Sequence, residues 1–322
     1  PLTFREYWYS TIPKCYALLD MQPLDAAGII TLQNYPTLQL MGDGIMIGFL
    51  DTGIDYQNRV FRNLDGTTRI VGIWDQTIQT GRTPQGLYYG TEYTEEMINA
   101  ALRSEDPLQI VPSVDTDGHG TFVASAAAGG AEVGKRFLGA APEASIAMVK
   151  LKPAKNYLKE FFVIAQDAVC YQENDIMLGL RYLNDLARKQ GMPLVICVAL
   201  GTSFGGHNGD SLLADILDIY ATVRNRCVVV GTGNEAARRH HYFNRFTDAQ
   251  DMRTAEIRVG EGTQSFAVEL WSTLPNIVMV SVTSPSGERT GMIPIRLGYL
   301  FDFLFTFERT TITVEYRLLQ EN

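Results

Sequence analysis

The stretch IMIGFLDTGID, residues 45–55, decides the fold. An unbroken apolar run from Ile45 to Leu50 ends at Asp51 and a turn that contains Gly53. A strand buried on both faces has this pattern, because helices cover both sides of a parallel sheet. Open α/β sheets place their ligands beyond the carboxyl ends of such strands, so Asp51 is a candidate functional residue. The stretch therefore predicts a buried strand with a carboxylate at its end.

Similar apolar runs recur along the chain and alternate with segments of helical period. The further runs cover residues 144–151, 194–200 and 227–230, and the helical candidates are 119–128, 176–189 and 211–223. Strands that alternate with helices in this way are typical of a parallel sheet with crossover helices. We therefore expect an α/β fold with a mostly parallel sheet flanked by helices.

The pattern changes near residue 250. Alternating, β-rich segments follow at 255–259, 264–271, 276–282 and 305–316, separated by proline and glycine turns. Antiparallel strands joined by turns have this pattern, so we expect a β-rich, jelly-roll-like insert. The predicted organisation is an N-terminal segment over 1–30, the main domain over 31–248, and the insert over 249–322.

Composition excludes two classes of partner. With 36 acidic against 27 basic residues the formal charge is -9, so the chain has no basic surplus for a phosphate backbone or an anionic lipid surface. The apolar runs are far shorter than the roughly 18 residues of a membrane-spanning helix. We therefore expect neither nucleic acid nor membrane as a partner.

Three loops carry polar groups of a kind that could act together. Asp51 ends the first strand, His119 stands in DGHGT (117–121) at the start of a helix, and Asn234 stands in GTGNE (231–235) after another strand. Carboxylate, imidazole and amide are three of the four parts of a Ser-His-Asp hydrolase. Each residue also has a structural interpretation, since Asp51 can cap a loop and Asn234 can cap a helix.

The order of these motifs resembles the subtilisin-like serine proteases, the subtilases. DTGID, DGHGT and GTGN stand in the family's order, and GAAP (139–142) and ALG (199–201) resemble its linking segments. The resemblance covers about residues 40–240. Residues 12–16, the long segment 152–175 and the β-rich insert resemble the clostridial Csp-type branch, whose members act in spore germination.

The resemblance implies a role for each residue. Asp51 would orient the imidazole, His119 would take the proton of the nucleophile, and Asn234 would donate to the oxyanion. The strand residues Ala199, Leu200 and Gly201 would pair with the substrate backbone. The family further implies a polypeptide substrate, a prodomain, and a spore or extracellular location. We expect no cofactor.

The nucleophile is missing from the expected place. Ser203 stands in a GTS string, but it precedes Asn234 and runs into a loop, whereas the subtilase serine follows the asparagine and opens a helix. We therefore expect the chain to be an N-terminal portion that lacks the serine and is inactive alone. A pseudoprotease that serves as a binding or regulatory module is the alternative.

Two further features are interpreted as structural and not as functional sites. Cys197 and Cys227 lie in apolar runs and are expected to be buried as small hydrophobic residues. Asp115 and Asp117 resemble a calcium pair, but Ca²⁺ takes about 6 to 8 oxygen ligands, so we assign no metal.

Overall fold

The computed structural model describes residues 15–18, 27–35, 37, 40–132, 137–235 and 238–318. The chain forms two compact units. Among the described residues, the larger unit comprises those within 15–203 and 213–266, and the smaller comprises Phe204–Leu212 and 267–318. The predicted boundary at residue 249 remains a prediction.

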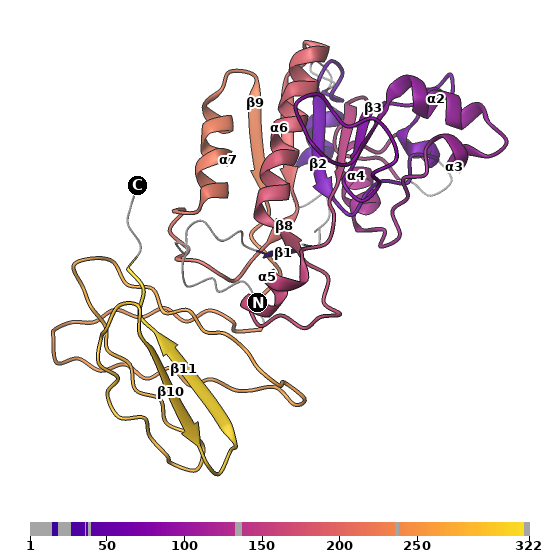
Figure 1. Ribbon diagram of the computed structural model, residues 1–322. Helices are drawn as coiled ribbons and strands as arrows, with labels where there is room; N and C mark the ends of the chain where they lie inside the picture. Colours follow the sequence, from indigo (N-terminus) through magenta and orange to yellow (C-terminus); the bar gives the residue numbers. More distant parts are fainter. Residues whose placement is uncertain are drawn as a thin grey trace. The chain divides into compact units, whose positions relative to one another are not determined.

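A six-stranded sheet forms the centre of the larger unit (Figure 1). Its strand order is β4-β3-β5-β2-β7-β9, and every neighbouring pair is parallel except β3 and β4. The strands are β2 (Met46–Asp51), β3 (Ile70–Asp75), β4 (Thr91–Thr94), β5 (Ser145–Lys150), β7 (Leu194–Val198) and β9 (Arg226–Val230). The mostly parallel α/β sheet predicted from the sequence is therefore confirmed.

Helices supply both layers that cover this sheet. The helices of the described residues are α1 (Ile29–Gln33), α2 (Glu95–Arg103), α3 (Pro107–Ile110), α4 (His119–Ala128), α5 (Asn156–Phe161), α6 (Glu173–Gln190) and α7 (Leu212–Thr222), with a 3₁₀ helix, η3, at Arg59–Phe61. Of these, α2, α4 and α6 contact strands of the sheet directly. No helix in the described part of the chain is long and apolar enough to cross a membrane.

The core consists of two hydrophobic clusters to which β2 contributes alternately. Leu50 packs in a cluster with Leu183 of α6, and Phe49 packs in another with Val123 of α4. Helix α6 approaches the sheet closely at Gly179, where a Cβ atom would lie 2.4 Å from Leu50 Cδ2. This packing fixes the end of β2, and with it Asp51, against the rest of the larger unit.

A second, three-stranded sheet has the order β6-β1-β8. It joins β1 (Cys15–Leu18), β6 (Tyr171–Gln172) and β8 (Leu200–Gly201), and both pairings are antiparallel. These strands come from widely separated parts of the chain. None of them is long enough to show a hydrophobic period, so sequence patterning could not reveal their pairing.

The smaller unit contains an antiparallel pair, β10 (Leu300–Phe305) and β11 (Thr310–Glu315). This pair fits the β-rich insert expected from the sequence. The individual strands predicted at 255–259, 264–271 and 276–282 were wrong, because these segments form no strand in the structure. Alternating apolar residues make a segment suitable for a strand, but the strand also requires a backbone partner.

Candidate active site

Asp51 and His119 lie in direct contact at the carboxyl edge of the parallel sheet. Asp51 ends β2 and is 1% exposed, while His119 begins α4. The imidazole Nδ1 lies 2.8 Å from Oδ1 and 3.0 Å from Oδ2 of Asp51. Because a carboxylate only accepts hydrogen bonds, a neutral imidazole carries its proton on Nδ1 and keeps a lone pair on Nε2. The buried carboxylate thus sets the tautomer of a potential base.

The residue after Asp51 connects the two loops through its backbone and its hydroxyl group. The N–H of Thr52 donates to Asp51 Oδ1 at 2.7 Å, and the N–H of Gly120 donates to Thr52 Oγ1 at 2.9 Å. A Cβ atom at Gly120 would lie 2.1 Å from the carbonyl oxygen of Gly53. Only glycine therefore permits α4 to begin this close to the end of β2.

Asp115, which the sequence suggested only as a cation ligand, is a second connection between these loops. Its Oδ1 accepts from Thr52 Oγ1 at 2.8 Å and from the N–H of Gly118 at 2.9 Å. Its Oδ2 accepts from the N–H and the hydroxyl of Thr121 at 2.9 and 2.6 Å. Burial raises the pKa of Asp115, but the hydrogen bonds outweigh burial and hold the pKa below its usual value.

The Asp115→Asn variant is expected to unfold more easily than the wild type at neutral pH. The amide that replaces Oδ2 is a donor and cannot accept from Thr121, so we expect a loss of about 1–3 kcal/mol in the free energy of unfolding. Because the pKa of Asp115 is lower in the folded state, its carboxylate stabilises the fold at pH values above the unfolded-state pKa of about 3.9. This stabilisation is lost as the pH falls through the folded-state pKa.

Urea denaturation of both proteins from pH 7 down to pH 3 measures this difference. The gap between variant and wild type should narrow as the pH falls below about 4, where the unfolded carboxyl group begins to bind a proton. If the difference in the free energy of unfolding between variant and wild type stayed constant over this pH range, the charge of Asp115 would contribute nothing to stability.

Two of the three residues predicted to bind substrate already pair with another part of the chain. Ala199 precedes β8, and Leu200 and Gly201 form it. Gly201 lies opposite Ala17 and Leu200 opposite Leu18, so β1 runs antiparallel beside β8. On its other side β1 pairs with β6, where Tyr16 lies opposite Tyr171. An extended segment of this chain therefore occupies the space between β6 and β8.

Asn234 and Ser203 lie in loops. Asn234 follows the carboxyl end of β9, which is two strands from β2 in the sheet, and its side chain is exposed. Because β2, β7 and β9 are parallel, Asn234 and Asp51 belong to the same sheet edge. Ser203 lies, as expected, in an exposed bend after β8, and the next helix begins only at Leu212.

Both cysteines that were predicted to be buried are more exposed than expected, since Cys197 is only partly buried. Burial, followed by the charge of Asp51, raises the pKa of the Cys197 thiol to about 11, so the thiol is protonated at neutral pH. Cys227 was predicted to be buried but is exposed. It lies on β9, an edge strand of the sheet, where Val229 and Val230 are also exposed. Within the described residues no group of three or more His, Cys, Asp or Glu side chains could hold a metal ion.

Comparisons with known proteins show similarity to one protein family. The model of the Subtilase family matches residues 42–290. The CspB protease of Clostridium perfringens is 31% identical with a TM-score of 0.71, over 89% of this chain and 55% of that one. A psychrophilic protease, S41, is 22% identical over 66% of this chain and 53% of that one, with a TM-score of 0.38. No curated protein matches the chain.

The chain thus spans about half the length of the CspB protease. The similarity to that protein confirms the resemblance to the Csp-type branch. The family model covers well over half of the chain, including Asp51, His119 and Asn234. The chain belongs to the subtilase family of serine peptidases.

Proposed function

We propose that the protein acts as a serine endopeptidase on extended polypeptides, with Asp51, His119 and Asn234 in its catalytic centre. The observation that carries the proposal is the contact of His119 Nδ1 with the buried carboxylate of Asp51. It leaves Nε2 as the atom that can remove a proton from a serine hydroxyl. Metal and cofactor play no part in this proposal.

Proton transfer and charge stabilisation during acyl transfer are then assigned to residues of this chain, while the attacking serine is not. His119 Nε2 takes the proton of the serine during attack and returns it to the leaving amine. Asp51 stabilises the imidazolium that forms in between. The amide of Asn234 donates a hydrogen bond to the oxyanion of the tetrahedral intermediate, where charge develops during the reaction.

The substrate is proposed to bind as a strand between β6 and β8. Segment Cys15–Leu18 supports this, because its backbone already adopts an extended conformation there and pairs with both strands. A peptide bound in the same way gains main-chain hydrogen bonds from two sides. Residues 1–30 would accordingly end a prodomain whose tail occupies the groove until it is displaced.

The nucleophilic serine is proposed to come from residues outside this chain. Ser203 suits the role poorly, since it stands in an exposed bend directly after β8, the strand that would bind the substrate. On this proposal the 322-residue chain by itself is inactive.

The occupied groove also favours a second candidate, a pseudoprotease that uses the subtilase fold for binding or regulation. A strand that remains between β6 and β8 would make the groove a permanent structural element. The two candidates differ in one respect that can be measured, namely whether the full-length protein hydrolyses peptides.

Steady-state hydrolysis by the full-length protein tests the proposal. Fluorogenic peptides with one, two and four residues before the scissile bond should show kcat/KM rising with length, because each added residue pairs with β6 or β8. Equal values for the short and long peptides would contradict strand binding. Absence of hydrolysis in a folded, full-length protein freed of residues 1–19 would favour the pseudoprotease.

The variant Asn234→Ala is expected to lower the kcat of the full-length enzyme by about 10²- to 10³-fold through one lost oxyanion donor. The value of KM should stay nearly unchanged, since the donor acts on charge that exists only in the transition state. Steady-state kinetics of Asn234→Ala beside Asn244→Ala, an exposed asparagine of the same unit, provide the measurement and its control. A large rise in KM with intact kcat would assign Asn234 to substrate binding instead.

A further inference from the structure

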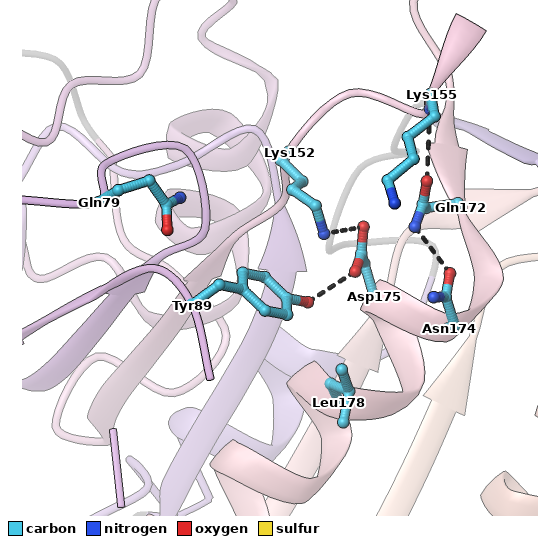
Figure 2. Close-up of a pocket in the computed structure, with 8 residues that line it drawn as sticks. All are labelled: Gln79, Tyr89, Lys152, Lys155, Gln172, Asn174, Asp175 and Leu178. Atoms are coloured by element: carbon cyan, nitrogen blue, oxygen red, sulfur yellow. Dashed lines mark hydrogen bonds and ion pairs between the residues drawn. The ribbon is translucent and has the colours of Figure 1, made fainter. Parts of the chain in front are cut away.

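A pocket of about 410 Å³ lies in the larger unit, and neither Asp51 nor His119 lines it (Figure 2). Its walls come from the loop between β3 and β4, the segment after β5, the end of β6 and the first turns of α6. The proposed catalytic mechanism uses none of its side chains. Its polar atoms therefore need a separate explanation.

Two of the acceptor groups in the wall are already engaged. The carboxylate of Asp175, which is 1% exposed, accepts from the Tyr89 hydroxyl at 2.6 Å and forms an ion pair with Lys152. The side-chain carbonyl of Gln79 accepts the backbone N–H of Gly90 at 2.9 Å. Figure 2 shows the Tyr89 hydroxyl and the Lys152 amino group converging on Asp175.

The remaining amide acceptors are engaged as well. The carbonyl of Gln172 accepts the backbone N–H of Lys155 at 3.3 Å. The amide of Gln172 in turn donates to the carbonyl of Asn174 at 2.9 Å. Each carbonyl and carboxylate oxygen of the lining side chains thus already accepts a hydrogen bond or an ion pair.

The polar groups of the lining that remain without a hydrogen-bond partner are donors. Asn174 Nδ2 and the amino group of Lys155 have no hydrogen-bond acceptor among the residues that the structure describes, and both side chains are exposed. The amino group of Lys155 lies over the ring of Tyr157, 5.8 Å from its centroid. Lys152 gives one of its three N–H groups to Asp175 and lies over the Tyr89 ring at 3.9 Å. A ligand for this pocket must therefore be an acceptor.

The net charge of the pocket lining also favours a ligand with acceptor groups, in this case an anion. Lys152 and Lys155 carry two positive charges against the single carboxylate of Asp175, so the lining has a surplus of one positive charge. Burial lowers the pKa of Lys152, while the hydrogen bond and charge of Asp175 raise it. An anion beside the amino group would add to the second effect and stabilise the charged lysine in its half-buried position.

We propose that this pocket binds a small anion, a carboxylate or phosphate group, through the amino groups of Lys155 and Lys152 and the amide of Asn174. The ion pair with Asp175 and the hydrogen bond from Gln172 hold the donors of Lys152 and Asn174 in place before the ligand arrives. This site is independent of peptide hydrolysis, and its test needs no catalytic serine.

Isothermal titration calorimetry on the 322-residue chain, with inorganic phosphate and with acetate at constant ionic strength, tests the site. We expect a dissociation constant on the order of 1 mM or tighter for at least one anion. Asn174→Asp keeps the acceptor for Gln172 but replaces the free donor with a negative oxygen, and Lys155→Met removes the charge while keeping the apolar stem. Each should weaken binding at least tenfold.

The control is Lys189→Met, which removes an exposed lysine in the last turn of α6, away from the pocket lining, and should leave the affinity unchanged. Binding of phosphate alone assigns a phosphate ligand, and binding of acetate alone assigns a carboxylate. The proposal is overturned if neither anion binds at 10 mM to the wild type. It is also overturned if Lys155→Met and Asn174→Asp, folded by circular dichroism, bind as tightly as Lys189→Met.

Discussion

Replacing His119 with alanine is expected to lower the kcat of the full-length protease by about 10⁶-fold, the loss known for the corresponding histidine of subtilisin itself. A serine hydroxyl is a weak nucleophile at neutral pH, and the account assigns the removal of its proton to His119 Nε2 alone. The contact with Asp51 at 2.8 Å orients the ring for this task. The residual rate would come from the oxyanion donors and substrate binding.

The measurement is single-turnover hydrolysis of a long peptide, with His241→Ala, an exposed histidine of the same unit, as the control. The control should keep the wild-type rate. If His119→Ala retained more than about a tenth of the wild-type kcat, another group would have to be the base, because general-base catalysis typically contributes 10²- to 10⁴-fold.

Replacing Asp51 with asparagine is expected to cost about 10⁴-fold in kcat, the size found for this substitution in a Ser-His-Asp triad. The asparagine amide can donate to Nδ1, and the imidazole proton then moves to Nε2, where a lone pair is required. The variant would keep the geometry of the site, but its imidazole would carry the proton on Nε2 and could not act as the base. Asp55→Asn is the matched control, because Asp55 lies four residues further along and is exposed.

The tautomer can be observed directly in the 322-residue chain. Nitrogen NMR of labelled histidine should show His119 protonated on Nδ1 in the wild type and on Nε2 in Asp51→Asn. This readout does not depend on the serine. The same tautomer in both proteins would mean that Asp51 does not orient the ring, whatever the change in activity.

Local sequence was sufficient to predict the sheet and the end of β2. The run from Ile45 to Leu50 can only be buried on both faces, and observed β2 differs from the prediction by one residue at each end. The helix predicted to begin at His119 does begin there, because small residues and flanking glycines let α4 approach β2. A buried strand and the start of a helix depend on residues close together in the sequence, so the sequence alone can predict them.

Other parts of the site depend on contacts between distant residues. Strands β1, β6 and β8 contain four residues or fewer, and each exists only because another segment supplies its hydrogen bonds. The role of Asp115 in joining the loops likewise could not be predicted from the sequence, since it depends on donors in the loop after β2 and in the first turn of α4. Cys227 was misjudged because an apolar run does not tell whether a strand lies at the edge of the sheet.

Labelling of the full-length protein with a serine-directed fluorophosphonate, followed by peptide mass spectrometry, tests the central claim most directly. Reaction requires a serine oxygen within about 3 Å of the imidazole Nε2. We expect a single labelled serine that is none of the serines in residues 1–322, with labelling lost in His119→Ala. Labelling at Ser203, or no labelling of a folded protein whose groove has been emptied of residues 15–18, would contradict it.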